Sequence, residues 1–279
     1  MKKKIIIVGR NSFIARHLQG YFKRRCIVNI ISYQKFIKNL NFNNIDYVIN
    51  CSSRIEYVKQ KYQSKFDHDL QISKKIFKFK KCKLIFLSTR KIYKPNNNIK
   101  ECDKILPKEN YSKNKYITEK KLLEILSERV LILRISNLIG LHNNKKKRKL
   151  HKTFIEIFLD NIKKNKIFDH KNIYKDFLPI NLFAKIVFLL VKKNKTGIFN
   201  VSMGKKIYLK SLIRWLNHYN TNKIMIINYP KNDYKKFNKD SFFLNNTTLL
   251  KSINIKFDLN DLKKECLRIS KKLFYEKKK

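Results

Sequence analysis

The sequence predicts an α/β fold built on a doubly wound parallel sheet. Short runs rich in Val, Ile and Leu alternate with stretches whose apolar residues recur at helical spacing. The first run, 4–8, ends at a glycine and leads directly into a helical pattern, so the order is strand, tight turn, helix. Strands that alternate with helices form parallel sheets, because a helix crosses over between successive strands.

The elements follow one another regularly through the first half of the chain. We expect strands at 4–8, 27–31, 47–51, 84–87 and 130–133, and helices near 13–22, 36–40, 66–79 and 111–126. After Gly140 a basic loop precedes a helix near 154–162. The segments "DFLPI" (176–180) and "GIFNVS" (197–202) are expected to return to the sheet, on either side of an apolar helix at 182–191.

The C-terminal part, from about residue 205, predicts a smaller α+β lobe. It offers a helix containing Leu212 and Trp215, a strand at 224–227 and a closing helix from about residue 261. The aromatic residues here are expected in the core. No internal repeat and no linker rich in Gly, Pro or Ser divides the chain.

The formal net charge is +46, which raises the question of a nucleic-acid partner. Lys, Asn and Ile are abundant along the whole chain, as expected from A/T-rich codons, and the densest basic cluster is "KKKRK" at 145–149. We therefore interpret the charge mainly as compositional bias and expect no nucleic-acid partner. Its positive field would still attract anionic small molecules.

Cysteine, histidine and apolar patterns exclude several classes. Five cysteines without a CxxC pair and six scattered histidines predict neither a disulfide framework nor a metal site. The longest apolar run, 182–191, is too short to insert in a membrane. The start "MKKKIIIVGR" has only five apolar residues, so we interpret it as a strand rather than a signal peptide and expect a cytoplasmic protein.

The turn "VGRNSFIA" lies where a dinucleotide phosphate loop belongs, between a strand and a helix N-terminus. Small residues, Gly9, Ser12 and Ala15, hold the places where close backbone approach is needed. The candidate cofactor residues of this turn are Gly9, Arg10, Asn11, Ser12, Phe13 and Ile14. The second strand ends in "IISYQ", where Ser32 stands in place of the acid that NAD enzymes use for the ribose, and Arg10 could pair with a 2′-phosphate. We therefore expect NADP, with NAD as the alternative.

"ENYSKNKYITEK" places Tyr111 and Lys115 four residues apart, on one face of a helix. A free phenol has a pKa near ~10, and a neighbouring ammonium lowers it. Such a tyrosine can exchange a proton with a carbinol while a nicotinamide carries hydride. The strand before "STRKIY" ends at Ser88 and Thr89, on the sheet edge where ligands bind in open α/β sheets, so a hydroxyl there can reach the same oxygen.

Six segments in this order resemble the extended short-chain dehydrogenase/reductases, the NAD(P)-dependent epimerase/dehydratase family of sugar-nucleotide enzymes. They are "IIIVGRNSFIARHL", "DYVINCSS", "LSTRKIY", "PKENYSKNKYITE", "LRISNLIG" and the pair "DFLPINLFAKIV" with "IFNVSMGKKIYLKSLI". The resemblance implies a Rossmann-type sheet with a substrate lobe. It assigns 1–140, with a return segment at about 174–202, to dinucleotide binding, and 141–173 with 203–279 to the substrate.

The resemblance also implies roles for individual residues. Thr89, Tyr111 and Lys115 would be catalytic, and Thr89, Arg90 and Asn137 would contact the substrate. Further cofactor contacts would come from Cys51, Ser52, Ser53, Leu87, Tyr111, Lys115 and Ser136. Helices 66–79 and 111–126 could form a homodimer interface.

Two departures from the family pattern narrow the function. Arg90 and Lys91 stand where the dehydratase branch has an Asp-Glu pair, which argues against 4,6-dehydration. The short stretch between Ile31 and Asp46 is similar to the dTDP-4-dehydrorhamnose reductase branch. We therefore expect an NADP-dependent reductase of a nucleotide-linked keto-sugar, in surface-polysaccharide or nucleotide-sugar biosynthesis. The alternatives are an NAD-dependent sugar-nucleotide 4-epimerase and a non-catalytic nucleotide- or RNA-binding protein on the same fold.

Overall fold

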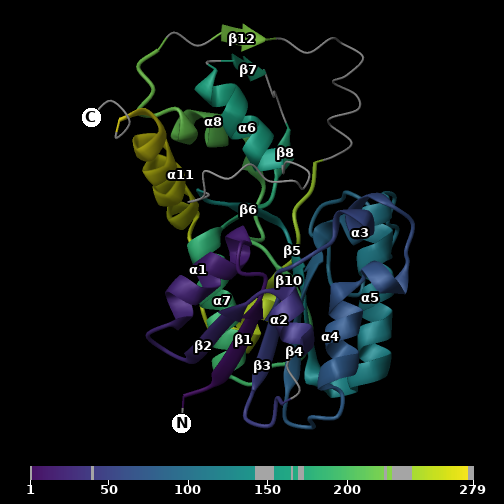
Figure 1. Cartoon of the computed structure of the whole chain (residues 1–279). Helices are drawn as coiled ribbons and strands as arrows, with labels where there is room; N and C mark the ends of the chain where they lie inside the picture. Colours follow the sequence, from purple (N-terminus) through teal and green to yellow (C-terminus); the bar gives the residue numbers. More distant parts are fainter. Residues whose placement is uncertain are drawn as a thin grey trace.

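The computed structural model describes residues 2–38, 41–141, 154–164, 166–168, 173–222, 225–227 and 241–275. Its centre is a six-stranded parallel sheet in the order β10-β5-β4-β3-β1-β2 (Figure 1). The strands are β1 (Lys4–Val8), β2 (Ile27–Ile31), β3 (Tyr47–Asn50), β4 (Lys83–Thr89), β5 (Val130–Ile135) and β10 (Gly197–Val201). The chain runs from β1 outward to β2 and then to the other side of β1 for β3, which confirms the predicted doubly wound fold.

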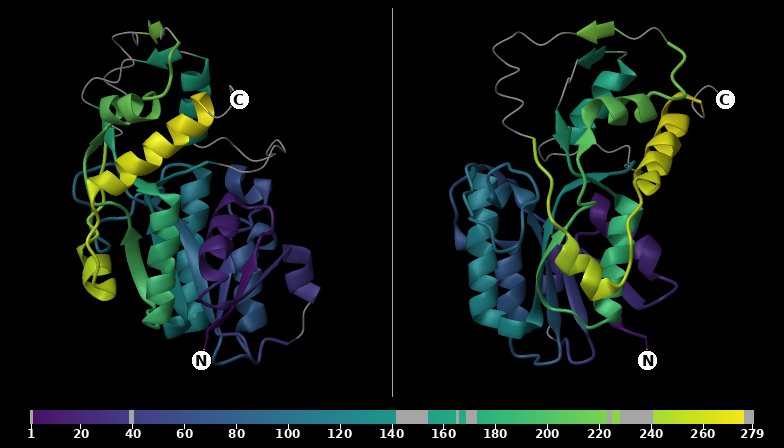
Figure 2. Two further views of the ribbon diagram at one scale, coloured as in Figure 1. Left: turned by 90° about the vertical axis from the view of Figure 1, so that its left-hand side faces the viewer. Right: turned by 180° about the vertical axis from the view of Figure 1, so that it is seen from behind.

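Helices cover both faces of this sheet, so alternate residues of β1 enter two separate cores. Ile5 and Ile7 pack with α1 (Phe13–Phe22) and α7 (Ile180–Lys192) on one face. Ile6 and Val8 pack with α2 (Tyr33–Lys38), α4 (His68–Ile76) and α5 (Asn110–Leu126) on the other. Figures 1 and 2 show these two helical layers with the sheet between them. Burial on both sides explains why the strands are continuous apolar runs in the sequence.

A second lobe lies beyond the carboxyl ends of the strands (Figure 1). Its helices are α6 (Phe154–Lys163), α8 (Leu209–Leu216) and α11 (Leu259–Phe274), and its short strands pair as β12 (Met225–Ile227) with β7 (Lys166–Phe168) and β11 (Ile207–Tyr208) with β8 (Tyr174–Lys175). The basic cluster predicted as a loop at 145–149 lies outside the described residues. Helix α10 (Thr247–Ile253) packs against α7 and β10 instead.

One predicted return to the main sheet is wrong. Residues of "DFLPI" form β9 (Phe177–Pro179), which pairs with β6 (Asn137–Ile139) in a separate two-stranded sheet. The reason is that the free edge of β5 is taken by β10, which runs parallel to it. The second returning segment, "GIFNVS", does supply that edge strand.

Two helices begin at other residues than the sequence predicts. The helix expected from residue 66 begins at His68, because the buried Asp67 carboxylate accepts the backbone N–H of Leu70 at 3.0 Å. The helix expected at 36–40 begins earlier, at Tyr33. None of the described helices combines the length and the apolar character that a membrane span requires.

Asp176 joins the second lobe to the sheet. This fully buried carboxylate accepts backbone N–H groups from Met203 at 3.0 Å, Gly204 at 3.1 Å and Leu244 at 3.2 Å. Its backbone carbonyl accepts the side-chain amide of Asn137 at 3.0 Å. Burial raises the pKa of Asp176 to about 7, against the lowering effect of the three backbone donors. Asp176 therefore holds together the segments that contain Asn137, Met203 and Leu244.

Candidate active site

Apart from Tyr111 and Lys115, which lie on α5, the predicted cofactor residues lie along one edge of the sheet, because parallel strands end on the same side. Gly9 to Ile14 follow β1, Ser32 follows β2, and Cys51, Ser52 and Ser53 follow β3. Leu87 lies near the end of β4, and Ser136 comes directly after β5. Neighbouring strands in the order β5-β4-β3-β1-β2 thus bring the whole set to one line across the sheet.

The turn after β1 approaches the end of β3 closely. Gly9 has a φ of +111°, and a Cβ there would lie 2.9 Å from the backbone carbon of Cys51 and from the nitrogen of Ser52. The Ser12 N–H donates to the Gly9 carbonyl at 2.8 Å, which closes the turn in front of α1. Arg10 and Asn11 are left exposed at its tip. A side chain at position 9 would therefore both strain the backbone and block this approach.

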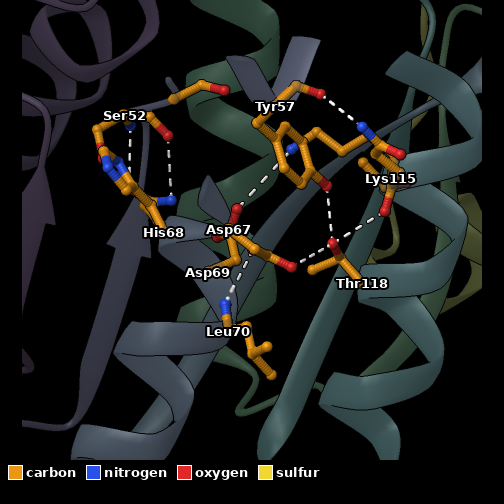
Figure 3. A network of polar contacts seen from close by, with 12 residues as sticks. Ser52, Tyr57, Asp67, His68, Asp69, Leu70, Lys115 and Thr118 are labelled. Carbon is orange, nitrogen blue, oxygen red and sulfur yellow. Dashed lines mark hydrogen bonds and ion pairs between the residues drawn. The ribbon is translucent and has the colours of Figure 1, made fainter. Parts of the chain in front are cut away.

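The end of β2 carries no acid, and its neighbours form a stacked pair that the sequence did not indicate. The Tyr33 ring lies 3.5 Å from the His68 ring, centroid to centroid, with an interplanar angle of 8°. His68 Nδ1 lies 2.9 Å from Ser52 Oγ (Figure 3). Burial, helped by the nearby Arg54, lowers the pKa of His68 to about 4, so the imidazole is neutral at pH 7. The Ser32 hydroxyl accepts the Lys35 N–H at 3.2 Å.

The three predicted catalytic residues come from β4 and α5. Thr89 is the last residue of β4, is buried, and accepts the Lys91 N–H on its hydroxyl at 3.2 Å. Tyr111 lies in the first turn of α5 and is half-buried, while Lys115 lies one turn further and is buried. Helix α5 packs against β4, so these residues belong to two neighbouring elements.

Lys115 has a buried anionic neighbour that the sequence analysis missed. Its Nζ lies 3.8 Å from Asp69 Oδ2 and 4.4 Å from the centroid of the Phe86 ring. Burial raises the pKa of Asp69 to about 7, and the charge of Lys115 opposes that rise. The other carboxylate oxygen, Oδ1, is buried without a hydrogen-bond partner. In the sequence, "DHDL" is typical of a helix start, and nothing in it indicates that the second acid turns toward Lys115.

A hydrogen-bond network fixes α5 against α3 (Ile55–Lys59) and α4 (Figure 3). Thr118 donates to Asp67 Oδ2 at 2.6 Å and lies 2.7 Å from the Tyr57 hydroxyl. The Asn114 amide donates to the backbone carbonyls of Tyr57 at 2.7 Å and Gln60 at 2.8 Å. The helix that carries Tyr111 and Lys115 is therefore held by buried polar contacts as well as by apolar packing.

A second network ties the same helix to the sheet. Glu119 of α5 accepts Arg134 Nη2 at 2.7 Å, and its other oxygen accepts the Ser88 hydroxyl. Arg134 Nη1 also donates to the Tyr93 hydroxyl at 2.6 Å. Ser88 directly precedes Thr89, so the position of α5 over the end of β4 is fixed one residue away from a predicted catalytic group. A buried pair of this kind is costly to break from one side.

The predicted substrate residues are distributed over the junction with the second lobe. The side-chain amide and the backbone N–H of Asn137 donate to the Asp176 carbonyl at 3.0 and 3.3 Å. The Arg90 guanidinium lies 3.6 Å from the centroid of the buried Phe242 ring. Both residues thus face the lobe, and their contact with a substrate stays a prediction.

The site fits a nicotinamide dinucleotide on two observations. The backbone at Gly9 leaves no room for a Cβ beside the helix N-terminus of α1, as a phosphate cradle requires. Ser136 Oγ, at the carboxyl end of β5, is buried and has no hydrogen-bond partner, so it is available to a bound group. Within the described ranges, no cluster of three His, Cys, Asp or Glu side chains could hold a metal, and the cysteines are free thiols.

Comparisons with known proteins agree with this geometry. A model of the NAD dependent epimerase/dehydratase family matches residues 3–202. No curated protein matches the sequence significantly. Among solved structures, the UDP-N-acetylglucosamine 4-epimerase from Methanobrevibacter ruminantium M1, in complex with UDP-N-acetylmuramic acid, superposes with a TM-score of 0.78. Its sequence is 18% identical, and the match covers 99% of this chain and 100% of that chain.

Two further solved structures have the same architecture. A dTDP-4-dehydrorhamnose reductase from Clostridium acetobutylicum ATCC 824 has a TM-score of 0.73 at 16% identity, over 94% of this chain and 98% of that chain. RMD from Pseudomonas aeruginosa complexed with NADPH has a TM-score of 0.76 at 14% identity, over 99% of this chain and 99% of that chain. At these identities the solved structures establish the fold that the chain shares with them.

Proposed function

The chain belongs to the NAD dependent epimerase/dehydratase family, and from that premise we propose that it is an NADP-dependent reductase of a nucleotide-linked keto-sugar. It is an enzyme of this family and uses NAD or NADP. The proposal is supported by Thr89 at the end of β4 and by Tyr111 and Lys115 in the first turns of α5, the helix that packs against β4. A phenol, an ammonium and a hydroxyl in that arrangement suit proton transfer to a carbonyl oxygen.

Each residue has a proposed task. Thr89 Oγ1 hydrogen-bonds the carbonyl oxygen of the substrate, and Tyr111 Oη gives that oxygen its proton. Lys115 orients the ribose and acts on the charge of the phenol. The cofactor, when bound, supplies hydride. Gly9 and the N-terminus of α1 receive its pyrophosphate, and Ser136 is available to its nicotinamide end.

NADP is proposed over NAD because of the end of β2. Ser32 stands where a carboxylate would repel a 2′-phosphate, and Arg10 is exposed at the tip of the neighbouring turn. A guanidinium can bind a phosphate with two parallel hydrogen bonds. Replacement of Arg10 by Met is therefore expected to weaken NADPH binding much more than NADH binding.

The substrate class is proposed from the relatives and from charge. One structural relative is described in complex with UDP-N-acetylmuramic acid, and another is a dTDP-4-dehydrorhamnose reductase. The net charge of +46 favours the approach of a nucleotide diphosphate. Arg90 and Lys91 follow Thr89 in place of acids, so we do not propose a dehydratase.

An NAD-dependent 4-epimerase is the second candidate, because one of the structural relatives has that activity. The two can be separated by how the cofactor behaves. We would purify the protein, assay it for copurified NAD, and measure thermal shifts with NADPH, NADH and NAD, alone and with UDP-, dTDP- and GDP-sugars. NADPH oxidation that starts only when a keto-sugar nucleotide is added supports the reductase. Tightly retained NAD with sugar epimerisation supports the epimerase, and absence of any dinucleotide binding contradicts both.

A homodimer through α4 and α5 is part of the proposal. Phe77, at the end of α4, is 54% exposed, and Leu123 of α5 is 38% exposed. Apolar residues of this size on two adjacent helices suit burial by a second copy. Light scattering of the wild type and of Leu123→Glu tests this, and a monomeric wild type contradicts it.

A further inference from the structure

Glu119 of α5 lies where hydrogen bonds join that helix to the sheet. Its carboxylate accepts the Ser88 hydroxyl from β4, and Arg134 of β5 donates to it through Nε at 3.2 Å and through Nη2 at 2.7 Å. All three residues are buried, at no more than 4% exposure. Within the described ranges, every side-chain hydrogen bond between α5 and the strands of the main sheet ends on Glu119.

The alternation of side chains along β4 and β5 explains why a polar pair stands at this point of the sheet. Leu84 and Phe86 of β4 and Ile132 of β5 belong to the buried apolar cluster on the α5 side of the sheet. Side chains alternate between the two faces of a strand, so the next residues on that side are Ser88 and Arg134. These two are direct neighbours in the register of β4 with β5. The apolar face therefore ends in two polar side chains beneath α5.

On α5, Glu119 continues the line of the two residues proposed for catalysis. Tyr111, Lys115 and Glu119 recur every four positions, so they follow one another along one side of the helix, about 6 Å apart. On β4, Ser88 directly precedes Thr89. The bond between Glu119 and Ser88 thus joins the two elements that carry the proposed catalytic residues.

Arg134 is itself held on the side away from Glu119. Its Nη1 donates to the Tyr93 hydroxyl at 2.6 Å and to the backbone carbonyl of Glu101 at 2.8 Å. Tyr93 in turn donates to the side chain of Asn200, on β10, at 3.1 Å. The carboxylate of Glu119 is therefore connected to three strands of the sheet, β4, β5 and β10.

We propose that Glu119 is a positioning residue that sets the register of α5 on β4, meaning the position of the helix along and around its own axis. Through its bonds to Ser88 and Arg134 it fixes where the helix lies, and with it the placement of Tyr111 relative to the end of β4. This inference rests on the proposed function, which assigns Tyr111 and Thr89 to one reaction.

The physical reason is the directionality of hydrogen bonds. Apolar packing is non-directional, so by itself it defines the position of a helix on a sheet less sharply than hydrogen bonds, whose strength falls steeply with distance and angle. Precise placement matters for a reaction, because a displacement of about 1 Å can lower a rate about 100-fold. A buried carboxylate with donors from two strands supplies that precision eight residues beyond Tyr111.

The first test uses hydrogen exchange, which needs neither cofactor nor substrate. The backbone N–H of Lys91 donates to Thr89 Oγ1 at 3.2 Å, so its exchange rate reports how firmly that hydroxyl is held. In Ser88→Ala we expect the Lys91 amide to exchange about tenfold faster, because the end of β4 loses its bond to α5. Amides near a strand end exchange through local opening, so a general loss of stability would leave this rate nearly unchanged.

Two further variants serve as controls for the exchange measurement. Ser73→Ala is the matched control, because Ser73 is also a buried serine, on α4, and its hydroxyl donates to the Leu70 carbonyl at 2.8 Å. Ser88→Thr keeps the hydroxyl at position 88. Both are expected to keep the wild-type exchange rate of Lys91.

A kinetic arm follows NADPH oxidation with whichever keto-sugar nucleotide proves active. Ser88→Ala should lower kcat about tenfold through misplacement of the reacting groups. KM and the Kd of NADPH should stay within about twofold, since no binding group is removed. Glu119→Gln should lower kcat at least as much, because it also weakens the bonds to Arg134.

The two measurements separate this inference from the proposed function. If the protein never oxidises NADPH but its Lys91 amide responds to Ser88→Ala, the proposed function is wrong and the role of Glu119 stands. If the wild type is active and Ser88→Ala and Glu119→Gln match it in kcat and in Lys91 exchange, the proposed function stands and the role of Glu119 is wrong.

Other results would also overturn the inference. One is an equal increase of Lys91 exchange in Ser73→Ala or in Ser88→Thr. Another is a raised KM at unchanged kcat in Ser88→Ala, which would place the effect in substrate binding. The last is failure of both Ser88→Ala and Glu119→Gln to fold, as judged by circular dichroism, because these bonds would then hold the whole fold rather than the register of one helix.

Discussion

Two buried aspartates, Asp69 and Asp176, lie in different regions of this molecule and differ in the groups that their carboxylates contact. Burial raises the pKa of Asp69 and of Asp176 to about 7 in each case. Asp176, at the lobe junction, has three backbone N–H donors on its carboxylate. Asp69, beside the predicted catalytic helix, has one ammonium at 3.8 Å and an oxygen without a hydrogen-bond partner.

The difference indicates how the hydrogen bonds of a buried carboxylate distinguish a structural role from a functional one. A carboxylate whose oxygens are fully used by backbone donors serves the architecture, because every bond it can make joins two parts of the chain. A carboxylate that is left partly unsatisfied beside a cation costs stability and is expected where chemistry takes place. The predictions below test whether catalysis depends on the residues around Asp69 and whether folding depends on the lobe junction at Asp176.

The largest effect is expected from Tyr111→Phe. Loss of the proposed general acid should lower kcat about 10²- to 10⁴-fold, because a positioned proton donor contributes about that much. Thermal unfolding should change little, since the half-buried phenol lies in the first turn of α5. Stopped-flow NADPH oxidation and a melting curve measure the two quantities. If Tyr111→Phe keeps the wild-type kcat, Tyr111 is not the general acid and the proposed catalytic site is wrong.

The next largest effect separates the two aspartates by stability. Asp176→Asn turns an NH₂ group toward backbone donors, and we expect it to lower the free energy of unfolding by about 2–4 kcal/mol. Asp69→Asn leaves no backbone donor unpaired, and burial already raises the pKa of the Asp69 carboxyl to about 7, so that it is partly neutral at pH 7. The loss should therefore be about half of that or less. Urea denaturation of both variants measures this, and equal losses would erase the distinction.

A smaller effect concerns pH and His68, which stacks on Tyr33 beside the end of β2. Its folded pKa of about 4 lies below the unfolded value, so its contribution is present above about pH 6.5 and is lost as pH falls through 4. Asp69, with a raised pKa, acts in the reverse sense and loses its contribution as pH rises through about 7.

The measurement compares wild type with His68→Asn, whose amide can still reach Ser52 Oγ. Between pH 7 and pH 4.5 the wild type should lose roughly 1–2 kcal/mol more than the variant, after allowance for the partial exposure of the imidazole. Parallel pH profiles of the free energy of unfolding would show that His68 is not held neutral by its surroundings.

The smallest effect is expected at an exposed ion pair. Lys91 Nζ lies 2.8 Å from Glu109 Oε2, but both side chains are largely in solvent. Glu109→Gln should not change the melting temperature measurably, because exposed pairs contribute little. The result calibrates the buried pair of Asp69 and Lys115, and a large loss would show that exposure is a poor guide in this protein.

The sequence predicted the sheet because its strands are apolar on both faces and end in recognisable turns. Gly9 after β1 and the hydroxyls of Ser88 and Thr89 at the end of β4 were found in this way, since both mark a strand end. The exact strand partners were harder to predict. Nothing in "DFLPI" indicates that β10 already occupies the free edge of β5, so β9 was placed in the wrong sheet.

The residues that tune the site were beyond prediction for a different reason. Asp69 and His68 lie in a polar helix start, and a hydrophobic pattern carries no information about which acid or imidazole turns inward. Tyr111 and Lys115 were predictable because their spacing alone puts them on one face. Asp69 became the neighbour of Lys115 because of how α4 and α5 pack against each other. Local sequence does not specify that packing.

Gly140 lies between the start of α1 and the start of α7, where there is no room for any side chain larger than hydrogen. A Cβ there would overlap the Cγ2 atom of Ile180 and lie 3.1 Å from Cζ of Phe13. Close packing at Gly140 therefore fixes three segments relative to one another: the turn after β1, the start of α7 and the chain that leaves toward the second lobe. In related sequences positions 13, 140 and 180 are expected to covary, with any gain of volume at 140 matched by a loss at one of the other two.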